Sequence, residues 1–261
     1  MTTFLLMLSV AAGPLIVWWF QPKDRKKIRL LTTFSGAYVF SLTALHLMPE
    51  AFGGKSGGQH LHLPGVLILA GFFLQLLLDY FSHGIEHGHA HIHEEHGHMP
   101  WGVLLGLCIH AFVEGMPLGV GPEEAHHHHD HGDGGDHSHG HGLISEGARN
   151  SLILGIIMHN IPVSIVLMTL LLHQGVRVSA ALWWMLVFAS MSPLGMYIGG
   201  RVESLAQYSR ELMAIVVGIF LHISTTILFE TGEEHRFNRL KALAITLGAG
   251  LALAGIWLHP H

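Results

Sequence analysis

Two short segments of this chain place metal-binding side chains inside apolar surroundings. His110 and Glu114 are four residues apart in one apolar run, and His159 and Asn160 lie in another. Ionisable groups at bilayer depth are costly, and they usually face a bundle interior or a water-filled pathway. Imidazole and carboxylate ligands suit a divalent transition metal. The pattern predicts an intramembrane metal site, and moving the metal across the membrane is the simplest use of one.

The spacing of these residues favours a shared site. Because four residues advance about 400° round a helix, His110 and Glu114 project from nearly the same face. Pro117 follows Glu114, and Pro162 follows His159, so each half of the site lies beside a weakened helix. Hydrogen bonding between a protonated Glu114 and His159, with no metal, is the alternative that the residues leave open.

The elements that must position these residues are membrane-spanning helices. Of the 261 residues 50% are hydrophobic and 12% are charged, and the mean hydropathy is positive, which is typical of a polytopic membrane protein. Runs of about 18–22 apolar residues can cross about 30 Å of hydrocarbon. Eight such runs are present: Thr3–Phe20, Leu31–Phe52, Pro64–Phe81, Pro100–Val120, Ser151–His173, Val178–Gly199, Leu212–Glu230 and Leu240–His259. We expect an all-α fold, an eight-transmembrane-helix bundle with the metal site between helices 4 and 5, in one transmembrane domain (1–261).

The basic residues predict the orientation of this bundle. A cluster of Lys and Arg follows the first span instead of preceding it, which argues against a cleavable signal sequence and holds that end in the cytoplasm. Across eight spans, nine Lys and Arg fall on the cytoplasmic side and four on the other. We therefore expect an integral protein of the cell (inner) membrane with both termini extracytoplasmic. Cys108 is the single cysteine, so no intrachain disulfide is expected.

Two loops are rich in histidine. The loop 83–98 is expected on the cytoplasmic side and the loop 126–141 on the extracytoplasmic side. Alternating His and Gly cannot bury enough apolar surface to fold alone, and neutral imidazoles bind Zn²⁺-like ions weakly at many sites. We expect these loops to concentrate or sense metal; an inert solvated loop and a purification-tag remnant are the alternatives. Their predicted metal-binding residues include His87, His89, His91, His93, His126, His127, His128 and His129.

Three segments resemble motifs of the ZIP (Zrt/Irt-like) family of divalent-metal transporters. Residues 110–115 (His-Ala-Phe-Val-Glu-Gly) are similar to the family's fourth-helix His-(Ser/Asn)-x-x-Glu-Gly motif. Residues 159–162 (His-Asn-Ile-Pro) are similar to its fifth-helix motif, and residues 43–51 to the end of its second helix. The seventh span echoes the family's seventh helix more weakly, and the resemblance covers nearly the whole chain.

The resemblance implies uptake of divalent transition-metal ions toward the cytoplasm. Nitrogen-rich coordination favours zinc, with Fe²⁺, Mn²⁺ and Cd²⁺ left open. These ions are cargo, so we expect no tightly bound cofactor and no enzymatic activity. The lipid bilayer and a second copy of the chain, as a homodimer, are the expected partners, and no nucleic acid is expected.

The chain departs from the family pattern where a second metal would bind. Members with a two-metal centre carry an acid at the position of Val163 and Asn or Ser at the position of Ala111. An acid commonly precedes the sixth-helix Pro-Leu-Gly, where this chain has Ser192. We therefore expect a single transport site. Its predicted ligands are His110, Glu114, His159 and Asn160.

Three other polar residues are predicted to assist. His46 and Glu50, near the extracytoplasmic end of the second span, either line an entry vestibule or are interfacial polar residues without such a role. His222, in the middle of the seventh span, is either an auxiliary ligand or an interhelical hydrogen-bonding residue.

Other function classes remain open. A ZIP-like protein that binds metal without transporting it, as a sensor or as a partner of another transporter, is compatible with the missing acids. A membrane di-iron oxygenase would use clustered histidines such as His83 and His87, but it needs rigid helical spacing, and these histidines alternate with glycine. A zinc metalloprotease is disfavoured because no span contains His-Glu-x-x-His.

Overall fold

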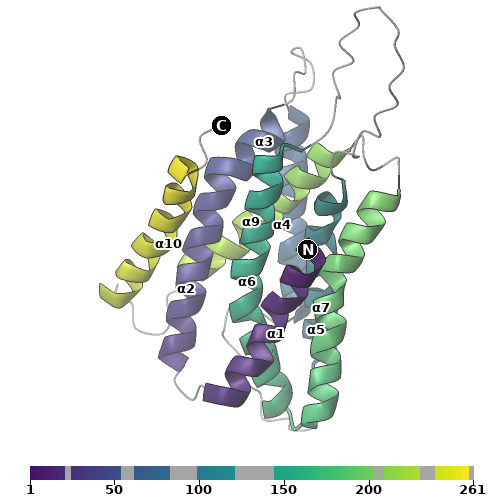
Figure 1. Ribbon diagram of the computed structural model, residues 1–261, viewed down its shortest axis with the longest axis vertical. Helices are drawn as coiled ribbons and strands as arrows, with labels where there is room; N and C mark the ends of the chain where they lie inside the picture. The colour runs from purple at the N-terminus through teal and green to yellow at the C-terminus, as the bar shows by residue number, and fades with distance from the viewer. Residues whose placement is uncertain are drawn as a thin grey trace, which may run out of the picture.

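The computed structural model describes residues 1–20, 25–53, 62–82, 99–120, 144–202, 205, 208–229 and 239–258. Nearly all of these residues are helical, and no strand occurs among them. Figure 1 shows the helices lying side by side in one bundle. They are α1 (Thr2–Phe20), α2 (Arg25–Leu42), the π-helical turn η1 (Thr43–Leu47), α3 (Met48–Phe52), α4 (His62–Ser82), α5 (Trp101–Gly119), α6 (Glu146–His173), α7 (Val178–Arg201), α9 (Ser209–Phe229) and α10 (Arg239–Leu258). The prediction of an all-α fold is confirmed.

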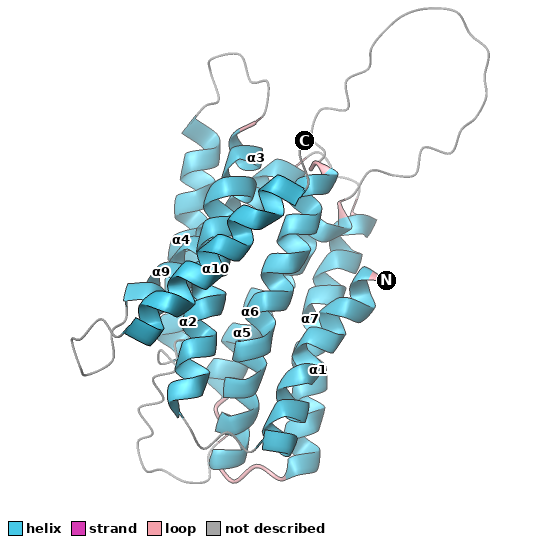
Figure 2. Cartoon of the chain, turned by 60° about the vertical axis from the view of Figure 1, so that its left-hand side comes forward, coloured by secondary structure: helices cyan, strands magenta, loops and turns pink. Residues whose placement is uncertain are grey.

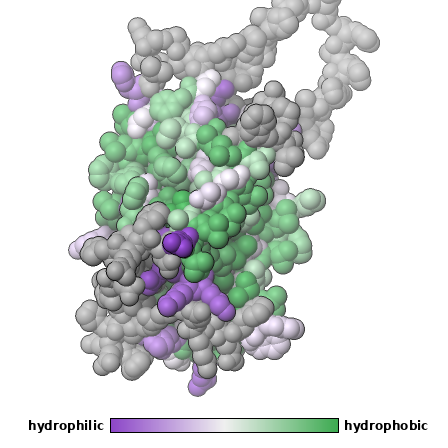
Figure 3. Space-filling view, turned by 90° about the vertical axis from the view of Figure 1, so that its left-hand side faces the viewer, coloured by the Kyte–Doolittle hydropathy of each residue, from purple (hydrophilic) through white to green (hydrophobic). Residues whose placement is uncertain are grey.

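The outer surface of the bundle is apolar. Within the described residues seven helical segments are long and apolar enough to cross a membrane, and α2, η1 and α3 together form one of them. A further helix, α10, packs against α2. Large apolar side chains such as Trp18, Phe81 and Trp183 are exposed by 58–74%. Figure 3 shows a broad hydrophobic face, with hydrophilic residues mostly toward its lower end. Because such a surface marks contact with lipid, the chain is an integral membrane protein.

The helices form two groups that pack more extensively within themselves than against each other. The first group comprises α1, α5, α6 and α7, and the second comprises α2, α4, α9 and α10 with the short η1 and α3. Figure 2 shows α1 and α7 on one side of the bundle and α2 and α10 on the other. One apolar cluster, containing Phe188 and Leu171, lies within the first group, and the other, containing Phe220 and Met213, joins the second group to α6 through Leu152 and Ile156. Contacts of α6 with α2, and of α5 with α4, join the groups.

Small residues bring α5 and α7 into close contact. Each helix carries two glycines four residues apart on the face that meets its partner: Gly115 and Gly119 on α5, and Gly195 and Gly199 on α7. A Cβ added at any of them would come well within 3.0 Å of a backbone carbonyl oxygen of the other helix. Small residues at this spacing let membrane helices approach closely. The glycine interface therefore fixes α5, which carries His110 and Glu114, against α7.

The second predicted span contains a local irregularity. In η1 the amide of Met48 donates a hydrogen bond to the carbonyl of Thr43, five residues earlier. Pro49 follows at the start of α3 and has no amide proton to continue the regular helical ladder. Such π-helical turns are frequent at functional sites. This turn carries His46.

Candidate metal centre

The structure brings three of the predicted ligands together. His110 and Glu114 come from α5 and His159 comes from α6, and one candidate ligand atom of each lies within 4.8 Å of the others. Their side chains are buried, with exposed fractions of 1%, 0% and 4% respectively. The imidazole rings of His110 and His159 are nearly perpendicular, with centroids 5.5 Å apart. The three side chains thus converge on one small volume between two helices of the first group.

The carboxylate of Glu114 is the unusual member of this cluster. Its Oε1 lies 2.7 Å from Nε2 of His110. Apart from this contact with His110, neither carboxylate oxygen has a hydrogen-bond partner in the part of the chain that the structure describes. A fully buried carboxylate is costly unless it takes up a proton or binds a cation. The donor set therefore suits a divalent cation, which would supply the missing partner for the carboxylate.

The separation between the ligand atoms of His110 and Glu114 is slightly shorter than a tetrahedral ion requires. Two ligand atoms bound to one Zn²⁺ at about 2.0–2.1 Å lie roughly 3.3 Å apart. The 2.7 Å between His110 Nε2 and Glu114 Oε1 would have to grow by roughly 0.6 Å to admit the ion. Small rotations of the two side chains can supply such a change. Two imidazoles and one carboxylate leave one position of a tetrahedral ion for water or a further ligand.

A proline shapes the α6 side of the site. Pro162 lies inside α6 and cannot donate the hydrogen bond that the carbonyl of Met158 would otherwise accept. Ser35 of α2 compensates for the missing hydrogen bond, because its Oγ donates to the carbonyl of Met158 at 2.7 Å. The residue after Met158 is His159. A polar contact between the two helix groups therefore supports the backbone directly beside a candidate ligand.

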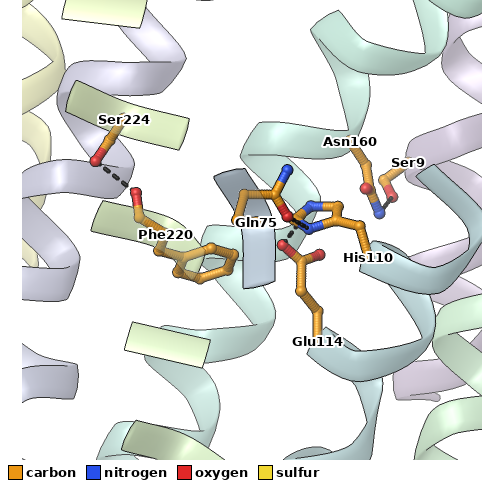
Figure 4. A network of polar contacts seen from close by, with 7 residues as sticks. All are labelled: Ser9, Gln75, His110, Glu114, Asn160, Phe220 and Ser224. Atoms are coloured by element: carbon orange, nitrogen blue, oxygen red, sulfur yellow. Dashed lines mark hydrogen bonds and ion pairs between the residues drawn. The ribbon is translucent and has the colours of Figure 1, made fainter. Parts of the chain in front are cut away.

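A buried glutamine that the sequence interpretation missed contacts the site. Gln75 of α4 is 0% exposed, and its Oε1 lies 3.0 Å from Nδ1 of His110. Figure 4 shows the Gln75 amide and the Glu114 carboxylate meeting the His110 ring. The available signal was a lone glutamine inside the apolar run Pro64–Phe81. Polar side chains in membrane helices commonly form interhelical hydrogen bonds.

The predicted fourth ligand has a different partner. The amide nitrogen of Asn160 donates to Oγ of Ser9 on α1 at 3.4 Å, and Ser9 in turn donates to the carbonyl of Leu6. Figure 4 shows the Asn160 amide directed toward Ser9. Asn160 therefore links α6 to α1 in this conformation, and its role as a metal ligand remains a prediction.

The assisting residues lie apart from the cluster of three. Glu50 accepts hydrogen bonds from the backbone amide and the hydroxyl of Ser145, both at 2.9 Å, and Ser145 caps the start of α6. The ring of His222 on α9 packs edge-on against Phe72 of α4, with centroids 4.9 Å apart. His46 is half-buried in η1. Glu50 therefore ties the second helix group to α6, and His222 lies between two helices of the second group.

The three positions at which the chain departs from the family pattern are buried. Ala111, Val163 and Ser192 are exposed by 1%, 7% and 3%. Ala111 and Val163 belong to the apolar cluster of the first group. Apolar side chains therefore occupy two of these three positions. The two His-rich loops, 83–98 and 126–141, lie outside the described residues.

A family model described as ZIP Zinc transporter matches residues 145–254, which run from the cap of α6 into α10 and include His159. No curated protein matches the chain. The α5 residues His110 and Glu114 lie outside the matched range, so their predicted part in the site depends on the geometry described above.

Proposed function

We propose that this chain, which matches a ZIP zinc transporter family model over residues 145–254, carries zinc toward the cytoplasm through one intramembrane site. The ligands of that site are His110, Glu114 and His159. Asn160 provides the fourth ligand if its amide turns away from Ser9. The whole chain acts as one transmembrane domain, and the ions are cargo rather than a resident cofactor.

The observation that carries this proposal is the buried cluster of two imidazoles and one carboxylate, whose candidate ligand atoms all lie within 4.8 Å of one another. Neutral imidazole nitrogens favour Zn²⁺ over harder ions such as Mn²⁺, which prefer oxygen ligands. One carboxylate neutralises half of the charge of a dication. The site therefore holds zinc without the second metal that a carboxylate-rich centre would stabilise.

The division of the helices supports a mechanism of alternating access. The three ligands lie in the first group, whereas α4 and α2, which contact the site through Gln75 and Ser35, lie in the second. A rigid-body displacement of one group against the other would open the site to each side in turn. Protonation of Glu114 or of the imidazoles weakens their hold on the ion and favours release. The loop 126–141 would capture ions outside and the loop 83–98 would receive them inside.

A second candidate function follows from the buried Ala111 and Val163. A protein that binds zinc but does not carry it, as a sensor or a partner of another transporter, would need the same three ligands. Without further carboxylates, a bound dication keeps uncompensated charge in a medium of low dielectric constant, which raises the cost of moving it. The two functions differ only in whether bound ions cross the membrane.

Zinc flux into vesicles containing the purified full chain distinguishes transport from binding without transport. We expect saturable uptake of radiolabelled Zn²⁺, with weaker uptake of Mn²⁺ and with Fe²⁺ and Cd²⁺ as competitors, because the site has two nitrogen ligands and one oxygen ligand. Protein-free vesicles are the control. Zinc binding with uptake no greater than in these vesicles would favour the sensor. Vesicles with inward- and outward-facing protein, distinguished by protease access, would test the direction and the predicted extracytoplasmic termini.

A further inference from the structure

The contact between Gln75 and His110 determines which ring nitrogen faces the ligand cluster. Nδ1 of His110 lies 3.0 Å from the amide oxygen of Gln75, and Nε2 lies 2.7 Å from Glu114. An amide oxygen only accepts hydrogen bonds, so Nδ1 must carry the hydrogen that it donates to Gln75. A neutral imidazole has one hydrogen, which leaves the lone pair on Nε2. That lone pair points toward Glu114, where a metal ion would bind.

Histidines that bind metals usually donate their other ring hydrogen to a fixed acceptor, which orients the ring. Carboxylates and backbone carbonyls are the common acceptors, and the Gln75 side chain offers the same kind of oxygen. Its burial is complete, so no solvent competes for the bond. Gln75 thus meets the requirements for an orienting partner of a metal-binding histidine.

The acceptor and the ligand belong to different helix groups. His110 is on α5 of the first group, whereas Gln75 is on α4, whose most extensive packing is with α9 of the second group. Gly71 and Gly218 bring α4 and α9 together, since a Cβ at either glycine would clash with a backbone carbonyl of the other helix. The position of Gln75 therefore depends mainly on the second group.

We propose that Gln75 is a positioning residue that orients His110 for metal binding and makes metal affinity depend on how the two helix groups are placed. This inference rests on the proposed transport function. When the groups lie as in this structure, the hydrogen bond holds His110 in its metal-binding tautomer. When they shift, His110 loses its acceptor and the site binds the ion less tightly, which assists release.

The kinetic consequence is a change in KM without a matching loss of maximal rate. Loss of an orienting partner typically weakens metal binding by about 10- to 100-fold. We expect Gln75→Met, which keeps the length of the side chain but removes the acceptor, to raise the KM for zinc by about 10- to 100-fold. Its maximal rate should remain within about twofold of the unsubstituted chain, because the three ligands are intact.

Gln75→Glu is the matched variant that separates orientation from packing. A glutamate keeps an acceptor oxygen for Nδ1, so it should restore the KM to near that of the unsubstituted chain. If Gln75 only fills space, Gln75→Glu should raise the KM more than Gln75→Met, because methionine preserves apolar packing whereas a buried carboxylate is costly. A KM that rises with Glu and stays unchanged with Met would overturn the proposal.

Binding of Co²⁺, followed by its visible absorption, gives a readout that does not need transport. The full-length His110→Ala variant supplies the baseline from ions bound elsewhere, including the His-rich loops. We expect Gln75→Met to weaken the remaining Co²⁺ binding and Gln75→Glu to preserve it. If these effects occur but no variant carries zinc, the transport proposal fails and the role of Gln75 stands. If zinc is carried and Gln75→Met leaves KM and Co²⁺ affinity unchanged, the role of Gln75 is wrong.

Discussion

Zinc flux should fall by at least about 100-fold in either of two variants, His110→Ala and Glu114→Gln. Replacing a residue that only orients a metal ligand typically lowers metal affinity or activity by about 10- to 100-fold. In our proposal these two residues are ligands themselves, so the loss should be larger. Glu114→Gln keeps the shape of the side chain but removes the only negative charge of the cluster. The measurement is initial uptake of radiolabelled zinc into vesicles containing equal amounts of each variant.

His173→Ala is the matched control for these variants. His173 ends α6, the helix that also carries His159, and it is not a member of the cluster. We expect this variant to retain zinc flux, which shows that loss of a histidine from the bundle is not itself harmful. Unchanged zinc flux in a normally folded Glu114→Gln variant would show that the Glu114 carboxylate is not part of the site.

Replacing Gly195 by alanine should destabilise the protein by at least about 2 kcal/mol. The new Cβ would lie against the backbone carbonyl of Phe112 on α5, which cannot move without the helix. Overpacking of this kind typically costs about 1–3 kcal/mol, and rigid backbone places it toward the upper end. Flux should fall as well, because α5 carries two ligands. Thermal unfolding in detergent, followed by size-exclusion chromatography, measures the loss.

Gly250→Ala provides the comparison for this prediction. Gly250 lies in α10, where a Cβ would meet nothing within 4 Å. Alanine favours the helix by about 1 kcal/mol relative to glycine, so this variant should be as stable as the parent or slightly more stable. Equal stability of the two alanine variants would mean that α5 and α7 are not held by close contact at their glycines.

The helical fold and the shared face of His110 and Glu114 could be predicted from the sequence because they depend on local patterns. Apolar runs predicted the helices, and the four-residue spacing placed His110 and Glu114 on one face of α5. The helix α6 begins at Glu146, ahead of the predicted span Ser151–His173. Ser145 caps it, and Glu146 and Arg149 lie in a first turn that a search for apolar residues excludes.

The pairing of the helices could not be predicted in the same way. Helices such as α1 are apolar on nearly every side, so periodicity does not tell which face meets a neighbour. The glycine pairs of α5 and α7 are visible in the sequence, but the sequence does not say that they face each other. Gln75 was missed for the same reason. A single glutamine in an apolar helix becomes informative only when its distance to His110 is known.

Locating the bound ion tests the central claim most directly. In crystals of the full chain soaked with zinc, the anomalous scattering at the zinc absorption edge should show a peak between α5 and α6. We expect it at about 2.0–2.2 Å from Nε2 of His110, a carboxylate oxygen of Glu114 and a ring nitrogen of His159. Zinc bound elsewhere in the bundle, with these three side chains in contact with each other and not with the ion, would contradict the account.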